Sequence, residues 1–105
     1  MIEQISADEF EEKVLKSNLP VAVEFYSDTC IPCKKLLPVL EELQDSFSKK
    51  IQIVKVNVNS DMALAKKYEV LVSPTVLFFK NGEETERVKG LDKKQNYSCI
   101  IEKLM

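Results

Sequence analysis

Hydrophobic positions along the chain follow two different periods, one typical of strands and one typical of helices. Three short runs that are mostly apolar and rich in β-branched or aromatic residues predict buried strands at 21–26, 51–58 and 76–79. Elsewhere apolar residues recur every three or four positions, which predicts amphipathic helices. Four helices are predicted. The first begins after Ser6 and ends by Ser17, and the second runs from about Pro32 to Phe47. The third runs from Ser60 or Asp61 to Tyr68, and the fourth follows Asp92 to the end of the chain.

Polar residues at two of the predicted helix starts fit a capping box. In this arrangement a side chain and another three residues later satisfy each other's backbone N–H groups. Ser6 and Glu9 form one such pair, and Asp92 and Gln95 form another, so each pair is expected to begin a helix. Pro38 falls inside the second helix, where it removes one hydrogen bond and is expected to kink the helix.

Turn signals complete the order of elements. Asn81-Gly82 predicts a two-residue type I′ hairpin, and the polar run 83–89 behind it predicts an edge strand that ends at Gly90. The segment 2–5 predicts a further short edge strand. Strands that alternate with helices and close with a hairpin predict an α/β fold. We expect a central mixed β-sheet of four to five strands, flanked by four helices on both faces.

Composition narrows the function classes. The 105 residues fit a single domain, 1–105, and 45% hydrophobic with 30% charged residues is typical of a globular protein. A net charge of −2 gives no reason to expect binding to nucleic acid or to an anionic membrane. No apolar run approaches the roughly 18 residues of a transmembrane helix, and no signal peptide is recognisable. We expect a cytoplasmic monomer.

Cys30 and Cys33 stand where the strand 21–26 gives way to the second helix. Positions three apart share one face of a helix, so the two sulfurs can meet in a small disulfide ring. At a helix N-terminus, backbone N–H groups and the helix dipole stabilise a thiolate, the nucleophile of thiol–disulfide exchange. In a reducing compartment such a pair is more often catalytic or metal-binding than structural. The spacing therefore predicts redox chemistry.

Two other interpretations of the cysteine pair stay open. An inert structural disulfide is one, although so small a ring constrains little of the chain. A zinc site is the other, but zinc usually takes four nitrogen or sulfur ligands, and the chain has no histidine and only Cys99 beyond the pair. No metal site is therefore expected. Cys99 falls on the polar side of the last helix and is expected to be exposed and not catalytic.

Several separated motifs occur in a fixed order over nearly the whole chain. They are Val23-Glu24-Phe25-Tyr26 before Cys30-Ile31-Pro32-Cys33-Lys34, Pro38 in the following helix, Lys55 in the central strand, Ser73-Pro74-Thr75, Phe79-Lys80-Asn81-Gly82, and Gly90 before the last helix. In these motifs and their order the chain resembles the thioredoxin family. The resemblance implies the thioredoxin fold and a thiol–disulfide oxidoreductase that reduces protein disulfides by dithiol–disulfide exchange.

The resemblance implies four residues in the exchange itself. Cys30 matches the family's exposed attacking cysteine, and Cys33 matches the more buried resolving cysteine. Glu24 matches a buried acid, aspartate in most members, that relays protons to the resolving thiol. A buried carboxylate without a partner is costly, which fits a functional group better than a structural one. Lys55 would lie on the neighbouring strand, close enough to pair with Glu24. The alternatives are an outward-facing Glu24 and a solvated Lys55.

The resemblance also implies a substrate surface around the disulfide. Pro74 matches the family's cis-proline, which packs against the disulfide and positions a substrate; an ordinary trans proline is the alternative. The residues implied at this surface are Ile31, Pro32, Ser73, Pro74, Thr75 and Gly90. Two of them depart from the family pattern, because Ile31 replaces the usual glycine and Ser73 the usual isoleucine or threonine.

The resemblance implies no cofactor beyond the redox-active Cys30–Cys33 disulfide. It implies re-reduction by a thioredoxin reductase that carries flavin and draws on NADPH. Two other function classes stay open: a disulfide oxidase or isomerase, and a non-catalytic binding module on the same fold. The first is typical of exported proteins, and the second would not need both cysteines together with Glu24.

Overall fold

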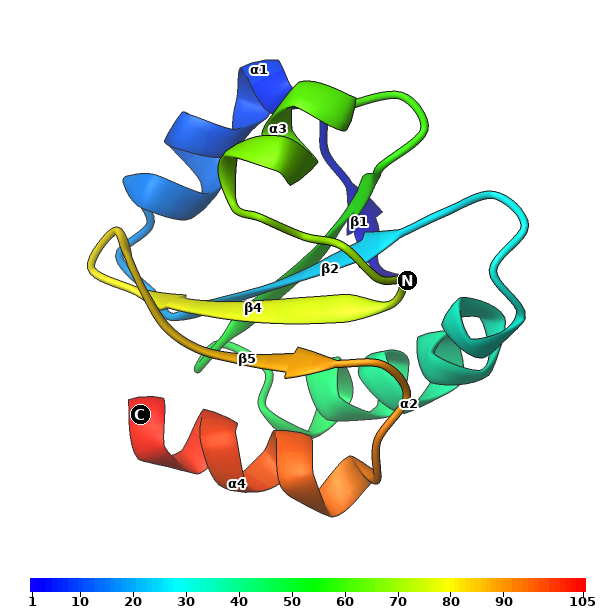
Figure 1. Cartoon of the computed structure of the whole chain (residues 1–105). Helices are drawn as coiled ribbons and strands as arrows, with labels where there is room; N and C mark the ends of the chain where they lie inside the picture. The colour runs from blue at the N-terminus through cyan, green and yellow to red at the C-terminus, as the bar shows by residue number, and fades with distance from the viewer.

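One mixed five-stranded sheet with helices on both faces accounts for the fold of the computed structural model, which describes residues 1–105 (Figure 1). The strands are β1 (Glu3–Gln4), β2 (Val21–Tyr26), β3 (Gln52–Asn57), β4 (Thr75–Lys80) and β5 (Glu83–Lys89). The helices are α1 (Ala7–Phe10), which continues as the π-helical turn η1 (Glu11–Leu15), then α2 (Ile31–Ser46), α3 (Met62–Lys67) and α4 (Lys94–Leu104). The π-helical turn is the one element that the periodicity did not predict.

The strand order is β1-β3-β2-β4-β5, which places β2 and its extension toward the cysteines near the middle of the sheet. β1 and β2 both run parallel to β3, whereas β4 is antiparallel to β2 and β5 is antiparallel to β4. The prediction of a mixed sheet is therefore confirmed. The polar strand β5 lies at the edge, as its sequence predicted.

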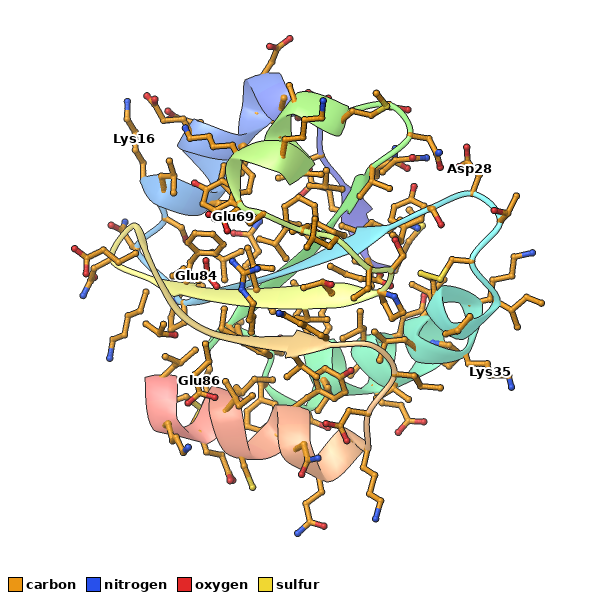
Figure 2. The ribbon with its side chains drawn as sticks, in the orientation of Figure 1. Lys16, Asp28, Lys35, Glu69, Glu84 and Glu86 are labelled. Atoms are coloured by element: carbon orange, nitrogen blue, oxygen red, sulfur yellow. A yellow bond between two sulfur atoms is a disulfide. The ribbon has the colours of Figure 1, made fainter.

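Each face of the sheet packs against its own helices. α1 and α3 cover one face, and α2 and α4 cover the other (Figure 1), and side chains fill the space between the helices and the sheet (Figure 2). The core under α2 and α4 includes Leu36, Leu40, Tyr97, Ile101 and Phe78, and the core on the opposite face includes Phe10, Val14, Val23, Leu64 and Phe79. Because β2 contributes to both cores, its side chains are buried on both faces. No helix is both long and apolar enough to cross a membrane.

One of the two predicted capping boxes is confirmed. The carboxylate of Glu9 accepts a hydrogen bond from the backbone N–H of Ser6 at 3.1 Å, at the start of α1. The second is wrong: α4 begins at Lys94, one residue later than a box at Asp92 requires. Asp92 instead accepts hydrogen bonds from the backbone N–H of Lys93 and the side chain of Asn96, both at 2.7 Å. The carboxylate of Asp92 therefore accepts hydrogen bonds from donors other than the N–H group that a capping box requires.

Asp61 occupies the N-cap position of α3, but its side chain does not cap that helix. Its Oδ1 atom accepts a hydrogen bond from the backbone N–H of Ala7 at 3.3 Å. Ala7 is the first residue of α1, where backbone donors have no partner within the helix. The carboxylate at the start of α3 therefore accepts a hydrogen bond from the first turn of α1. No local sequence pattern predicts such a long-range contact.

The predicted type I′ hairpin between β4 and β5 is confirmed. Both central residues have positive φ, 53° at Asn81 and 82° at Gly82. Glycine is also required by space, because a Cβ atom at Gly82 would lie 2.9 Å from the carbonyl oxygen of Leu15. The turn therefore packs closely against the end of the first helix.

Candidate functional site

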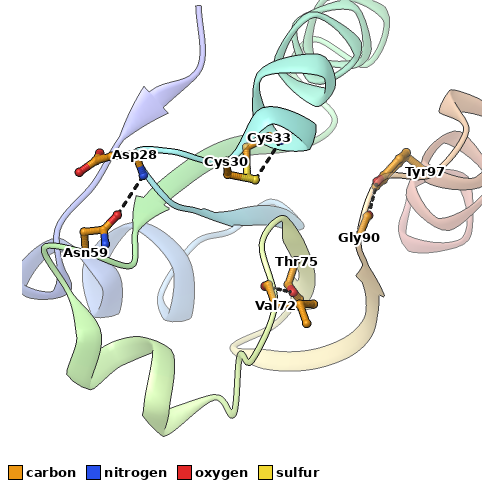
Figure 3. The surroundings of a disulfide bond; sticks show 8 residues. All are labelled: Asp28, Cys30, Cys33, Asn59, Val72, Thr75, Gly90 and Tyr97. Carbon is orange, nitrogen blue, oxygen red and sulfur yellow. Dashed lines mark hydrogen bonds between the residues drawn. A yellow bond between two sulfur atoms is a disulfide. The ribbon is translucent and has the colours of Figure 1, made fainter.

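A disulfide joins Cys30 and Cys33 at the point where the chain leaves β2 and enters α2 (Figure 3). Their Cα atoms are 5.2 Å apart. Cys30 is the N-cap of α2, and its Sγ accepts a hydrogen bond from the backbone N–H of Cys33 at 3.1 Å. Pro32 fits here because its missing N–H would have no partner in the first turn. When the disulfide is reduced, this N–H and the helix dipole favour a thiolate at Cys30.

Exposure separates the two cysteines only slightly. Cys30 is 9% exposed and Cys33 is 6% exposed, so the expected contrast between an open and a buried sulfur is small in the oxidised protein. Ile31 and Pro32 between them are exposed, Ile31 to 65%. A partner therefore meets the Ile31-Pro32 turn before it meets either sulfur.

Glu24 is buried in the middle of β2, with 2% of its surface exposed. Its Oε2 atom has no hydrogen-bond partner. Burial raises the pKa of Glu24 to about 7, and the positive charge of Lys55 opposes that rise. An outward-facing Glu24 is thereby ruled out. The carboxyl group exchanges its proton near neutral pH, which is what a proton relay at this site needs.

Lys55 lies beside Glu24 but does not form the ion pair that the sequence suggested. The two residues are aligned across the parallel strands β2 and β3, so both side chains point to the face covered by α2. No ammonium–carboxylate contact joins them; the Lys55 Nζ lies 5.3 Å from the centroid of the Tyr26 ring. The expectation of a Glu24–Lys55 pair is corrected, because the aromatic ring of Tyr26 takes up the ammonium group.

A hollow of about 170 Å³ brings these groups together under the disulfide. Its walls include both cysteines, Glu24, Lys55 and Tyr26. Lys55, from a distant part of the sequence, thus shares one space with Glu24 and the two cysteines. A thiol at Cys33 faces the same hollow as the unpartnered carboxylate. The structure therefore places the four predicted catalytic residues in one constellation.

The Ser73-Pro74 peptide bond is cis, so the alternative of an ordinary trans proline is wrong. Pro74 is buried and Ser73 is partly exposed. Thr75 pairs with Phe25 at the end of β2 that leads to the cysteines, and the backbone N–H of Gly90 donates to the carbonyl of Pro74 at 2.7 Å. The segment 73–75 and Gly90 therefore lie at the same end of the sheet as the disulfide.

The sequence reading missed three exposed apolar residues near that end. Leu71 and Val72 precede the cis bond, and Leu91 follows Gly90; they are 90%, 48% and 47% exposed. Val72 is held by its carbonyl, which accepts a hydrogen bond from the hydroxyl of Thr75 at 2.7 Å (Figure 3). The sequence does hold a signal for them: these apolar residues lie in loops, where neither a strand nor a helix period explains them as core residues.

A second missed feature anchors the loop before the disulfide. The backbone N–H of Asp28 donates to Oδ1 of Asn59 at 2.9 Å (Figure 3). Nδ2 of Asn57 donates to Oδ1 of Asp28 at 2.7 Å. Asn57 is only 7% exposed and also accepts from the backbone N–H of Asn59 at 2.8 Å. These bonds fix the loop to the end of β3. From the sequence alone, Asn57 and Asn59 at the end of a strand do not show which loop they bind.

Cys99 is a free, exposed thiol on α4, as predicted. We expect it to react with iodoacetamide in the oxidised protein, where Cys30 and Cys33 are protected in their disulfide. We also expect Cys99→Ser to keep at least about half of the disulfide-reducing activity, since surface substitutions seldom matter away from a site. Mass spectrometry of the alkylated protein and an activity assay check both points. A Cys99→Ser protein that loses most of its activity contradicts the prediction.

No cluster of three or more histidine, cysteine, aspartate or glutamate side chains is arranged to hold a metal ion. The groups that line the hollow include two sulfurs, one buried carboxyl group and one ammonium group. Together they can transfer two electrons and a proton.

Comparison with known proteins agrees with this chemistry. The family model described as Thioredoxin matches residues 1–103. The thioredoxin of Rickettsia bellii (strain RML369-C) is 38% identical over 96 residues, which cover 91% of each chain. Thioredoxin M-type, chloroplastic, of Spinacia oleracea is 38% identical over 104 residues, which cover 99% of this chain and 58% of the spinach chain. The thioredoxin of Rickettsia prowazekii (strain Madrid E) is 32% identical over 103 residues, which cover 98% of each chain.

Proposed function

This chain belongs to the thioredoxin family and is a thiol–disulfide oxidoreductase, and we propose that Cys30 attacks substrate disulfides while Cys33 resolves the product. The observation that supports this assignment is the position of Cys30 at the N-cap of α2, where it receives the backbone N–H of Cys33. Cys33, one turn into the helix, faces the hollow that contains Glu24.

In the first step the Cys30 thiolate attacks one sulfur of a protein disulfide. The substrate S–S bond breaks, the departing sulfur takes the electron pair as a thiolate, and Cys30 is left in a mixed disulfide. The N–H of Cys33 and the positive end of the helix dipole support this step, because both lower the free energy of the Cys30 thiolate.

In the second step the Cys33 thiol gives its proton to Glu24 and attacks the Cys30 sulfur. The substrate leaves as its second thiolate, and the Cys30–Cys33 disulfide is formed, so two electrons pass to the substrate. A base is most effective when its pKa lies near the working pH, and the pKa of Glu24 is about 7. Its unpartnered Oε2 supports the same role.

Ile31, Pro32, Ser73, Pro74, Thr75 and Gly90 are proposed to receive the substrate segment around its disulfide. Ile31 is 65% exposed and offers an apolar contact, with Val72 providing another at 48% exposure. Burying such side chains favours association by about 25 cal/mol per Å² before the costs of binding are counted. An extended segment that carries apolar residues beside its cystine fits this surface.

A thioredoxin reductase is the proposed donor that returns electrons to the disulfide. This direction of exchange belongs in a reducing compartment, and the cytoplasm is the proposed location. The exchange uses the chain's own cysteines as its redox group.

Reduction of insulin disulfides, followed by the turbidity of the released B chain, tests the function. With dithiothreitol as donor, the protein is expected to accelerate precipitation well above dithiothreitol alone, and the Cys30→Ser/Cys33→Ser double variant is the matched control. If the unaltered protein does not accelerate precipitation, the assignment as a disulfide reductase is wrong.

A redox titration against glutathione separates reduction from disulfide formation. The reduction potential of thioredoxins is about −270 mV, and that of strong disulfide oxidants is about −120 mV. We expect a potential close to the thioredoxin value. A value near that of the oxidants would favour an oxidase.

A further inference from the structure

The side chain of Tyr26 lines the active-site hollow and reaches along one face of the sheet, over the neighbouring strand β3. Tyr26 lies two residues after Glu24 on β2, so the two side chains share one face. Its hydroxyl donates a hydrogen bond to Oε1 of Gln4 at 2.8 Å. Gln4 belongs to β1, and β3 lies between β1 and β2. The Tyr26 side chain therefore spans β3, beside Lys55, which is aligned with both Gln4 and Glu24.

This placement decides where the Lys55 ammonium lies. Its Nζ is 5.3 Å from the Tyr26 ring centroid, within the range in which a cation is attracted to an aromatic face. Lys55 and Glu24 are cross-strand neighbours, an arrangement that normally favours an ion pair. No such pair forms, and Oε2 of Glu24 has no partner. The ring thus competes with the carboxylate for the same cation.

We propose that Tyr26 is a positioning residue for the second step of the exchange: its ring holds the Lys55 ammonium away from Glu24 and so leaves the carboxylate free to accept the Cys33 proton. The proposal rests on the proposed role of Glu24 as the base for Cys33. A close Lys55 ammonium would stabilise the carboxylate and make it a weaker base.

Lys55 is the cation that matters among the groups facing Glu24. The groups that border the same hollow as Glu24 are Lys55 from β3, Tyr26 on β2, Asp28 in the following loop, Cys30 at the N-cap of α2, and Cys33 and Lys34 in α2. The charge of Glu24 also reaches Tyr97 of α4. The β4 partner of Glu24 is the apolar Val76. Burial is the main cause of the raised pKa of Glu24, and the charge of Lys55 is what opposes it. Moving that ammonium closer therefore lowers the pKa further.

Replacing the ring tests the proposal directly. In Tyr26→Leu the ammonium is free to approach Glu24, and the titration midpoint of the Glu24 carboxyl, followed by ¹³C NMR, is expected to fall by about one pH unit. Tyr26→Phe is the matched control, because it keeps the ring and loses the hydroxyl contact to Gln4. Its midpoint is expected to stay within about 0.3 of the unaltered protein. An unchanged midpoint in Tyr26→Leu overturns the proposal.

A second pair of variants excludes a simple effect of water entering the hollow. In a Lys55→Met background no ammonium is present to move, so adding Tyr26→Leu is expected to leave the Glu24 midpoint unchanged. If the midpoint falls as much as in the presence of Lys55, the ring acts by excluding water, and the proposal is wrong. Amide spectra of each variant check that the fold is kept.

The rate of mixed-disulfide resolution separates this inference from the function on which it rests. If Glu24 is the base, the acidic limb of the pH–rate profile shifts in Tyr26→Leu by the same amount as the NMR midpoint. A shifted midpoint with an unshifted rate profile overturns Glu24 as the base and leaves the Tyr26–Lys55 contact established. A shift in neither overturns the positioning role alone.

Discussion

Cys33→Ser is expected to accumulate a covalent complex with its substrate, whereas Cys30→Ser is expected to form none and to lose turnover. The reason is the asymmetry of the helix start. Cys30 caps α2 and receives the N–H of Cys33, so it is the thiol whose thiolate is stabilised. Without Cys33 the mixed disulfide has no neighbouring thiolate to resolve it, although the first attack still occurs. Both variants are expected to fall by about 10³-fold or more in insulin reduction, because each removes a reacting group.

The complex is measured by mixing each reduced variant with a protein disulfide substrate and resolving the products on a non-reducing gel. A new band in Cys33→Ser that disappears with dithiothreitol is the expected result. The matched control is Cys33→Ser/Cys99→Ser, which shows that the exposed Cys99 does not form the bond. A complex formed by Cys30→Ser/Cys99→Ser instead reverses the two roles.

Local sequence signals predicted the elements of the fold closely. The apolar run that became β2 has the predicted bounds of 21–26, and the Asn81-Gly82 turn and the polar edge strand β5 were also correct. Each depends on residues close together in the chain, since a short, mostly apolar run or a turn with positive φ leaves few alternatives. The capping box at Asp92 failed although its spacing was right. Its carboxylate found another donor, the side chain of Asn96, and the helix began one residue late.

The sequence predicted which residues make up the site but not which of them contact one another. Cys30, Cys33, Glu24 and Lys55 all border one hollow, as the resemblance implied. The expected pairing of Glu24 with Lys55 failed because the position of a long, flexible ammonium depends on every group it can reach. Here that group is the aromatic ring of Tyr26, the next side chain on the same face of β2. Strand neighbours show which side chains share a face, whereas the choice between two partners is decided by tertiary contacts.

Glu24→Gln is expected to stabilise the oxidised protein above neutral pH and to leave its stability unchanged in acid. In the unfolded chain a glutamate titrates near its ordinary value of 4.5, whereas in the folded protein the pKa of Glu24 is about 7. Below about pH 4.5 the carboxyl is protonated in both states and contributes no difference. Between pH 4.5 and 7 the unfolded chain releases the proton while the folded chain keeps it, so rising pH favours unfolding. Above pH 7 the penalty is constant.

The magnitude follows from the same two pKa values. A difference of about 2.5 pH units corresponds to about 3–4 kcal/mol at most, because one unit is worth about 1.4 kcal/mol. We expect Glu24→Gln to raise the free energy of unfolding by about 1–3 kcal/mol at pH 8, since the amide must also remain partly unpaired in the core. Urea denaturation from pH 4 to 8 measures the difference. Glu102→Gln, at an exposed position on α4, is the matched control and is expected to show no such pH dependence.

The same substitution is expected to slow the second step of the exchange, by about 10²-fold if Glu24 is the base for Cys33. A residue that weakens the fold above neutral pH and speeds the resolution of the mixed disulfide has a functional reason to be buried in β2. Stopped-flow decay of the mixed disulfide at pH 7 measures this rate beside the denaturation series. Parallel stability curves for Glu24→Gln and the unaltered protein would show that the carboxyl keeps its ordinary pKa when buried. An unchanged decay rate would remove Glu24 from the proton path.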